Sequence, residues 1–389
     1  MKILFLKDKR SHTGIEGSAT YLFRMCKVLN KMKIPYLVLY NGKNDYYFKT
    51  LKKNNIKIRF INFPKETPKN FFRFNQIKIL REKIDKLILK GNYSLINTHF
   101  PHLNNFINPN IKIPVFTHWH GAQYKNDPLK VFSRNFIDNF NLRNLLFSAY
   151  RKFKIFNFNL SHKVIAVSNA SKNTACKSFL VDKKKILINR YGVERYNVNK
   201  VGTINKEFNI PNDAKIILSA GRITRDKGVE EFCEIAKKLA NKKLKFFFLG
   251  GYRSEEYYKN ILKKYSKYVI FPGMRSDIEK FYKSSHIFLF LSHRESAGMV
   301  LMEAMNFKLP IVAWNIIGVN EIVKNNHNGL LIRFGNKDNV ILAIKKLILN
   351  KKKYNLLSEN SFRSFDNYNI NKSVENLIDI FNEKKTKKN

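Results

Sequence analysis

The stretch that decides the fold is IILSAGRITRDKG, at positions 216–228. Its apolar beginning, Ile216–Ser219, leads through Gly221 into a loop, and an amphipathic segment follows Gly228. Such a run is typical of a strand buried on both faces of a parallel sheet. Ligands of these sheets bind where strands end, so Arg222 and Lys227 would bring two cations there, and this pair suits a diphosphate. A solvated basic loop is the alternative, because lysine and arginine occur throughout the chain.

The same rhythm of short apolar runs and longer amphipathic segments extends in both directions. It breaks once, in the polar stretch 194–213, which ends in the turn signal IPND. Two successive sets of buried strands indicate two doubly wound α/β domains of Rossmann type. We therefore expect an N-terminal domain over 1–194, a C-terminal domain over 195–365, and a helix with a basic tail over 366–389. The expected strands are 3–6, 36–40, 95–97, 115–116, 164–167 and 186–188, then 216–219, 246–249, 269–271, 287–291, 311–313 and 330–332.

A second motif, ESAGMVLMEAM at 295–305, also follows an apolar run. Buried glutamates are rare unless they are paired, and here Glu295 and Glu303 bracket an apolar stretch. The small residues 296–298 would let backbone N–H groups at a helix start approach an anion. The spacing favours two separate hydroxyl-binding roles over a hydrolase pair, whose carboxylates lie about 5–9.5 Å apart. Ordinary exposed glutamates on a helix are the alternative.

Histidines form a third candidate group, in the sequence THWHG at 117–121. His120 is the main candidate for a functional side chain, with His99 as a weaker one. A single histidine at a strand end is more often structural, but two histidines bracketing Trp119 before a glycine favour function. Metal binding by His99, His118 and His120 is disfavoured, because no carboxylate or cysteine stands at helpful spacing.

The E-x7-E spacing of Glu295 and Glu303, combined with Gly-Arg-x4-Lys-Gly at 221–228, resembles the donor-site signature of family 4 retaining glycosyltransferases. The stretches 309–313, 318–323 and 328–331 extend this resemblance. The resemblance implies the GT-B fold, in which two Rossmann-like domains face each other across a cleft and a C-terminal helix crosses back to the N-terminal domain. It also implies transfer of a sugar from a nucleotide-sugar donor with retained configuration.

The resemblance assigns roles residue by residue. Arg222 and Lys227 would bind the donor phosphates, Glu303 the ribose, and Glu295 the transferred sugar, while His120 would face the reaction centre. Glu16 stands where the family has a first glycine, and Gly17 matches the second. The implied catalytic residues are Arg222, Lys227, Glu295 and His120. The implied donor-binding residues are Gly17, Gly221, Gly273, Met274, Ser296, Ala297, Gly298, Met299, Val300 and Glu303.

The sequence lacks an Asp-x-Asp pair that would hold a divalent ion on a diphosphate. We therefore expect no metal and no cofactor, with cations and helix dipoles stabilising the leaving group. The expected partners are a nucleotide-sugar donor, with UDP favoured, and a glycan or lipid-linked acceptor. A sugar-nucleotide epimerase of the same fold is an alternative enzyme.

The formal net charge is +44. It fits attraction to an anionic membrane or to nucleic acid, or a bias toward lysine and asparagine without function. No base-reading motif occurs, so specific nucleic-acid binding is disfavoured. Aromatic and basic residues alternate in 131–158 and 70–89, which predicts either contact with a membrane surface or ordinary amphipathic helices. Three scattered cysteines, no signal peptide and no apolar run of 18 residues predict a cytoplasmic protein.

Overall fold

The computed structural model describes residues 1–8, 17–41, 54–63, 74–121 and 157–383. These residues form two compact units. Unit 1 runs to Arg190 and also includes the segment that begins at Ser373, whereas unit 2 spans Tyr191–Lys372. The chain passes from unit 1 to unit 2 after Arg190 and returns to unit 1 at Ser373, within the last helix.

Unit 1 is built on a sheet of seven strands in the order β3-β2-β1-β4-β5-β6-β7, and all neighbouring strands are parallel. The order reverses on either side of β1, as doubly wound folds require. β3 was not expected from the sequence, because it is three residues long and mostly exposed, so no apolar run marks it. The strands are β1 (Ile3–Lys7), β2 (Tyr36–Tyr40), β3 (Ile58–Phe60), β4 (Leu95–His99), β5 (Val115–Trp119), β6 (Lys163–Ala166) and β7 (Ile186–Ile188).

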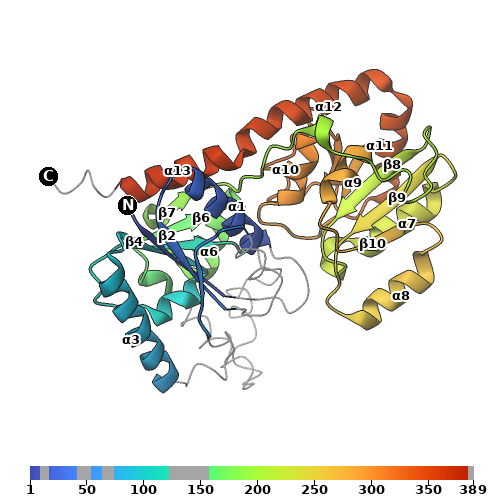
Figure 1. Ribbon diagram of the computed structural model, residues 1–389. Helices are drawn as coiled ribbons and strands as arrows, with labels where there is room; N and C mark the ends of the chain where they lie inside the picture. The colour runs from blue at the N-terminus through green and yellow to red at the C-terminus, as the bar shows by residue number, and fades with distance from the viewer. Residues whose placement is uncertain (9–16, 42–53, 64–73, 122–156, 384–389) are drawn as a thin grey trace. The chain divides into compact units, whose positions relative to one another are not determined.

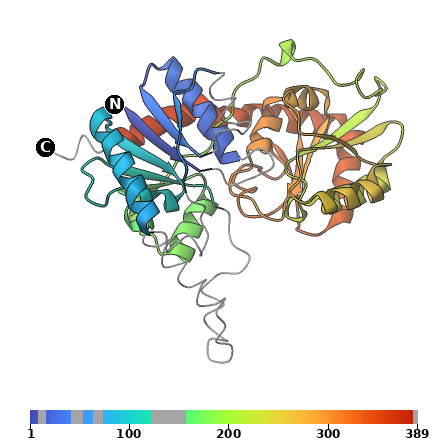
Figure 2. The same ribbon diagram turned by 60° about the horizontal axis from the view of Figure 1, so that its bottom comes forward.

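Helices cover both faces of the unit 1 sheet. On one face, α3 (Phe74–Gly91) buries Leu80, Ile84 and Ile88, which recur every four residues and so form one stripe of the helix. α6 (Asn169–Phe179) and the 3₁₀ helix η2 (Pro101–Phe106) lie on the same face. The other face is covered by α1 (Gly17–Lys31) and α13 (Ile370–Asn382), which lie beside each other in both views (Figure 1, Figure 2).

The last helix is tied to unit 1 by specific contacts. The hydroxyl groups of Tyr21 in α1 and Ser373 in α13 lie 3.0 Å apart, and Ser373 also donates to the carbonyl of Arg190. The rings of Phe116 in β5 and Phe381 in α13 meet edge to face at 4.8 Å. The C-terminal helix therefore completes the core of the N-terminal unit.

Unit 2 repeats the plan with six parallel strands in the order β10-β9-β8-β11-β12-β13. The strands are β8 (Lys215–Ala220), β9 (Leu244–Leu249), β10 (Ile270–Gly273), β11 (Ile287–Phe290), β12 (Ile311–Trp314) and β13 (Gly329–Ile332). The helices are η5 (Arg225–Lys227), α7 (Val229–Leu239), α8 (Glu255–Tyr265), α9 (Ile278–Ser284), α10 (Met299–Asn306), α11 (Lys337–Leu349) and α12 (Lys351–Phe365). The prediction of two parallel-sheet α/β domains is confirmed.

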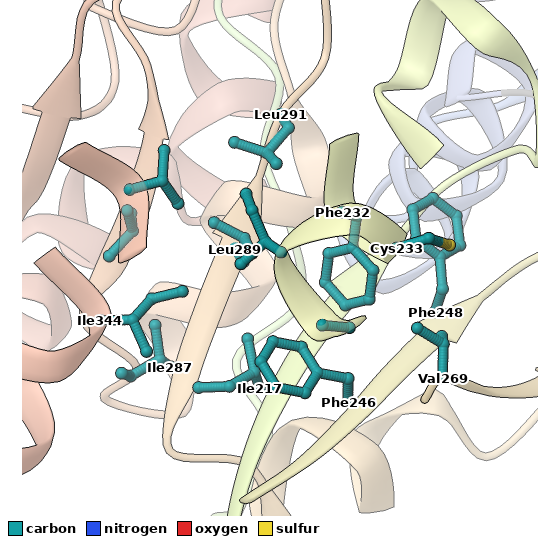
Figure 3. Packing of buried hydrophobic residues seen from close by; sticks show 14 of the residues in the cluster. Ile217, Phe232, Cys233, Phe246, Phe248, Val269, Ile287, Leu289, Leu291 and Ile344 are labelled. Atoms are coloured by element: carbon teal, nitrogen blue, oxygen red, sulfur yellow. The ribbon is translucent and has the colours of Figure 1, made fainter. Parts of the chain in front are cut away.

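The core of unit 2 lies between its sheet and the helices α7, α8 and α11. Phe232 of α7 packs against Phe246 and Phe248 of β9 (Figure 3). The ring centroid of Phe232 lies 5.8 Å from that of Phe246 and 5.4 Å from that of Phe248. Burying a phenylalanine fully contributes about 1.5–3 kcal/mol. This packing holds β8 and β9 in place, and with them the loops that follow these strands.

Candidate active site

The candidate donor site begins where the strand order of unit 2 reverses. β8 pairs with β9 on one side and with β11 on the other. Ligands of open α/β sheets bind beyond the carboxyl ends of the strands at such a point. Both motifs singled out in the sequence follow these strands, one after β8 and one after β11. The structure therefore brings together two segments almost 70 residues apart.

At Gly228 the loop after β8 packs closely against the loop after β11. Its φ of 67° is left-handed, and a Cβ atom there would lie 2.0 Å from the carbonyl oxygen of Leu291. The carbonyl of Asp226 also accepts hydrogen bonds from the backbone N–H of His293 (2.9 Å) and the hydroxyl of Ser292 (3.2 Å). No residue with a side chain fits this close approach without displacing the backbone.

Lys227 and Glu295 form an ion pair across these loops. The ammonium Nζ lies 2.8 Å from Glu295 Oε2, and each side chain is 18% exposed. The second oxygen, Oε1, accepts from the backbone N–H of Ser296 at 3.0 Å. Burial by itself would raise the pKa of Glu295, but Lys227 and the N–H groups of Ser296 and Gly298 bring that pKa below its ordinary value. Glu295 is thus ionised at neutral pH and is oriented by the backbone.

Gly318 supports Glu295 from the other side. A Cβ atom on Gly318, whose φ is 92°, would lie 2.3 Å from the carbonyl oxygen of Glu295. The loop after β12 therefore approaches the E-x7-E segment as closely as a glycine permits.

Glu303 is buried on α10, with only 7% of its surface exposed. Its Oε2 accepts a hydrogen bond from the hydroxyl of Tyr282 at 2.9 Å. α10 begins after Gly298, which is left-handed with a φ of 38°. Glu295 thus precedes the helix while Glu303 lies in its second turn, as the sequence indicated. The partner Tyr282 was not expected, because nothing in the sequence links α9 to α10.

Asp226 is a carboxylate that the sequence analysis passed over. Burial raises its pKa, but Thr224, Lys227, Arg294 and Arg222 together lower that pKa below the ordinary value. Arg222 therefore lies near the same carboxylate as Lys227. Asp226 is a negative charge that interacts with two cations expected to bind phosphate, and its position inside the quoted loop was the only signal for it.

The other donor-site residues lie along the same edge of the unit 2 sheet. The backbone N–H of Gly221 donates to Leu249 (2.8 Å), and that of Gly250 donates to Gly273 (3.0 Å). Gly273 ends β10 with a φ of 75°, and Met274 beyond it is 56% exposed. Ser296, Ala297 and Gly298 are buried, whereas Met299 and Val300 are partly exposed at the start of α10.

The candidate residues of unit 1 lie at the carboxyl ends of β1, β4 and β5. His120 follows β5, and its Nε2 lies 3.2 Å from Nδ1 of His99 at the end of β4. His118 is fully buried beside them and bonds to Asn97 instead. Gly17 is the exposed first residue of α1. Among the described residues, no group of three or more His, Cys, Asp or Glu side chains could hold a metal ion.

Lys7 and Asp8 were missed by the sequence analysis. Lys7 ends β1 and is fully buried, and its ammonium lies 3.7 Å from Asp8 Oδ1. Asp8 Oδ2 lies 3.0 Å from Nε2 of His102. A lysine at the end of the first apolar run gave no sign of burial, because lysine is rarely buried unless it is paired.

The predicted membrane segments are only partly described. Residues 131–156 and 70–73 lie outside the described part of the chain. In α3, Ile79 and Leu89 are 53% and 79% exposed, while Leu80, Ile84 and Ile88 pack on the sheet. The helices seen in the described ranges include none that is both long enough and apolar enough to cross a bilayer.

Comparisons with known proteins match both halves of the chain. The family model "Glycosyltransferase Family 4" matches residues 15–195, and "Glycosyl transferases group 1" matches residues 201–364. The chain is 25% identical over 256 residues to the capsular polysaccharide biosynthesis glycosyltransferase CapM of Staphylococcus aureus, covering 61% of this chain and 65% of CapM.

Two further known proteins are similar to this chain. A UDP-Gal:alpha-D-GlcNAc-diphosphoundecaprenol alpha-1,3-galactosyltransferase of Escherichia coli is 26% identical over 247 residues, which are 60% of this chain and 63% of that enzyme. The crystal structure of Anabaena Alr3699/HepE in complex with UDP and glucose superposes with a TM-score of 0.78 at 17% identity, over 98% of this chain and 100% of that one. At this identity the superposition establishes the fold. The aligned parts span slightly less than two thirds of the two curated relatives.

Proposed function

Because the chain belongs to the GT-B glycosyltransferases of family 4, we propose that it is a metal-independent retaining enzyme that uses a nucleotide-diphosphate sugar. It transfers a hexosyl or N-acetylhexosaminyl unit, with UDP as the favoured nucleotide. The acceptor is a glycan or a lipid-linked glycan in the synthesis of a cell-surface polysaccharide, lipopolysaccharide or glycoconjugate.

The observation that carries this proposal is the Lys227–Glu295 ion pair at the strand-order reversal. Lys227 is partly exposed and held by a carboxylate, so it presents a preorganised cation without a metal. Arg222, close to Asp226, adds a guanidinium that can bind phosphate oxygens in a bidentate manner. The α10 N-terminus supplies backbone N–H groups beside them. A diphosphate matches this set better than any neutral ligand.

The ribose and the sugar are assigned to the two glutamates. Glu303 accepts from the hydroxyl of Tyr282, and a carboxylate of this kind suits a vicinal diol because both of its oxygens are acceptors. Glu295 stays ionised beside Lys227 and can accept from a sugar hydroxyl. Neither glutamate is assigned the role of a covalent nucleophile.

The proposed steps of sugar transfer follow from where charge develops during the reaction. As the bond between the anomeric carbon and the phosphate oxygen breaks, negative charge grows on the diphosphate, where Arg222 and Lys227 stabilise it. The sugar becomes oxocarbenium-like. The acceptor hydroxyl attacks from the face that the diphosphate leaves and gives its proton to the departing phosphate, so the configuration is retained.

The choice of UDP and of the acceptor class rests on the relatives. The E. coli relative is named for UDP-Gal and for a diphosphoundecaprenol acceptor, and the CapM relative for capsular polysaccharide. We place the enzyme in the cytoplasm, on the inner face of the cytoplasmic membrane, where its net charge of +44 would attract anionic lipid. Flotation with anionic and neutral vesicles tests this placement, and absence from both kinds of vesicle would refute it.

The function is tested first by donor binding. A thermal-shift screen of UDP-, GDP- and ADP-sugars should show stabilisation by one nucleotide class, because a ligand of the folded state raises the melting temperature. Transfer to polyprenyl-diphosphate sugars is then followed by mass spectrometry, and NMR of the product reads the anomeric configuration. Turnover of the donor sugar to its epimer without any acceptor would favour the epimerase instead, and an inverted anomer would refute retention.

A further inference from the structure

Three parallel strands place a lysine and two histidines in one row. The strand register pairs Lys7 of β1 with His99 of β4, and His99 with His118 of β5. All three side chains are fully buried. His120 directly follows β5, and its ring stacks on that of His118 with the centroids 5.6 Å apart. The ring of His99 stacks on those of His118 (4.7 Å) and His120 (5.1 Å).

The tautomer of His118 follows from its partner. Asn97 donates its Nδ2 to the carbonyl of Phe116 at 3.0 Å, which fixes the orientation of the amide. Asn97 Oδ1 therefore faces His118 Nδ1 at 3.0 Å and can only accept. His118 thus carries its proton on Nδ1. Burial lowers the pKa of His118 to about 3, so this ring is neutral.

His99 is under the same constraint, with a cation beside it. Burial places its pKa well below the ordinary value, and His118, His120 and Lys7 lower that pKa further. Its Nε2 is buried and has no hydrogen-bond partner among the described residues. A buried N–H without an acceptor is rarer than an acceptor without a donor, and nearby Lys7 favours a lone pair over an N–H group. The proton of His99 therefore belongs on Nδ1.

We propose that His99 is a positioning residue that donates its Nδ1–H to His120 Nε2, so that His120 stays a neutral ring whose only proton is on Nδ1. This inference rests on the proposed function, because it specifies what His120 does in transfer. His120 would then offer an N–H to a sugar or acceptor hydroxyl and would act as a hydrogen-bond donor, not as a base. The sequence could not distinguish these roles.

Protonation of His120 would require the proton of His99 to change its position. An imidazolium at His120 must donate from Nε2, so His99 would have to accept at Nδ1 and move its own proton to the buried Nε2 beside Lys7. The rings of His120 and Phe100 lie 5.0 Å apart, edge to face, and Ser171 holds the next residue, Gly121, through its carbonyl at 3.2 Å. Within the described ranges, the other titratable groups near the three histidines are Lys7, Asp8, Tyr21, Tyr40 and His102.

Nitrogen NMR of the histidine-labelled full chain tests the tautomer directly. The His120 signals are assigned by their loss in His120→Asn. We expect a protonated Nδ1 and an unprotonated Nε2 at His120 from about pH 8 down to below its ordinary pKa of about 6.5. A proton on Nε2, or a cationic ring near neutral pH, would overturn the proposal without any activity measurement.

Kinetics then separate positioning from packing. In His99→Phe we expect kcat to fall about 10-fold to 100-fold, as for other residues that orient a functional histidine, with donor KM nearly unchanged. The acid limb of kcat/KM should move up toward pH 6.5, because His120 is then released to become an imidazolium, and its positive charge would oppose the oxocarbenium-like sugar of the proposed mechanism. His99→Asn, whose amide can reach the position of Nδ1, should restore most of kcat and the original pH profile. His118→Phe removes a ring from the same stack but no bond to His120, so its pH profile should match the wild type.

The outcomes distinguish this inference from the proposed function. Equal effects of His99→Phe and His118→Phe on the pH profile would reduce His99 to a packing residue. Full turnover in His120→Phe, which has no N–H to donate, would end the link to catalysis. If the wild-type chain transfers no sugar from any donor, the proposed function fails, and the nitrogen signals still decide the tautomer.

Discussion

Replacing Lys227 with alanine should remove the cation that the proposed mechanism needs and leave Glu295 without its partner. At 2.8 Å and an effective dielectric constant of about 20, the direct attraction amounts to about 6 kcal/mol. The cost of desolvating both groups offsets most of it. A charged hydrogen bond of this kind contributes about 1.5–3 kcal/mol net, and we expect Lys227→Ala to lower the free energy of unfolding by that amount at pH 7.

The loss of stability should depend on pH with a defined sign. In the wild type the pKa of Glu295 lies below its ordinary 4.5, so its contribution is present above that pH and is lost as pH falls through the folded-state value. In Lys227→Ala burial acts without the ammonium, the pKa of Glu295 rises, and protonation becomes favourable for the folded state. The difference in unfolding free energy between the two proteins should therefore shrink from pH 7 toward pH 4.

In Lys227→Ala the loss of transition-state stabilisation should exceed the loss of unfolding free energy. Loss of one preorganised charge typically reduces turnover about 10²–10³-fold, or about 2.7–4 kcal/mol. The assays are urea denaturation at several pH values and initial rates with a saturating donor. Arg225→Ala is the matched control, because Arg225 lies in the same 3₁₀ turn with its side chain 83% exposed. Near-normal turnover in Lys227→Ala, or a stability loss that does not change with pH, would refute the reasoning.

Three further outcomes are expected. Gly228→Ala should destabilise the chain by about 2–4 kcal/mol, because it adds both a left-handed backbone strain and a steric clash. The control Gly335→Ala has a similar φ of 85° but open space around it, so it should show only the backbone strain of about 1 kcal/mol. Equal melting temperatures of the two variants would contradict the close approach to Leu291. Glu303→Gln should raise donor KM about tenfold with kcat little changed, and Tyr282→Phe should do so more weakly; an unchanged KM would remove the ribose assignment. A chelator should leave initial rates unchanged, and recovery of lost activity by added Mg²⁺ would refute metal independence.

Most of the fold could be predicted from the sequence because buried parallel strands leave a local signature. Each apolar run expected from the sequence forms a strand whose ends differ from the expected ones by at most three residues. The exception is β3, whose short and exposed backbone pairs with β2 without an apolar run. The pairing of α13 with unit 1 through Ser373 and Phe381 depends on side chains more than 180 residues from their partners along the chain.

The residues of the candidate donor site could also be named from the sequence, and their donor-binding roles stay a prediction. The motifs name two cations and two carboxylates, and the type and spacing of these residues are local properties. The sequence did not reveal which of these residues contact each other in the folded chain. The partner of Lys227 lies 68 residues away. Asp226 meets Arg294 because the loops after β8 and β11 fold against each other, and Tyr282 meets Glu303 because α9 lies beside α10.

The sequence by itself determined that the chain has two sets of buried parallel strands and which residues carry charge at their ends, since both follow from residue type and short-range order. Only the tertiary structure decided that Lys7 is buried and that His99 bonds to His120. The physical reason is that the protonation and orientation of a buried side chain depend on neighbours from other strands. Strand register, which no single stretch of sequence contains, sets those neighbours.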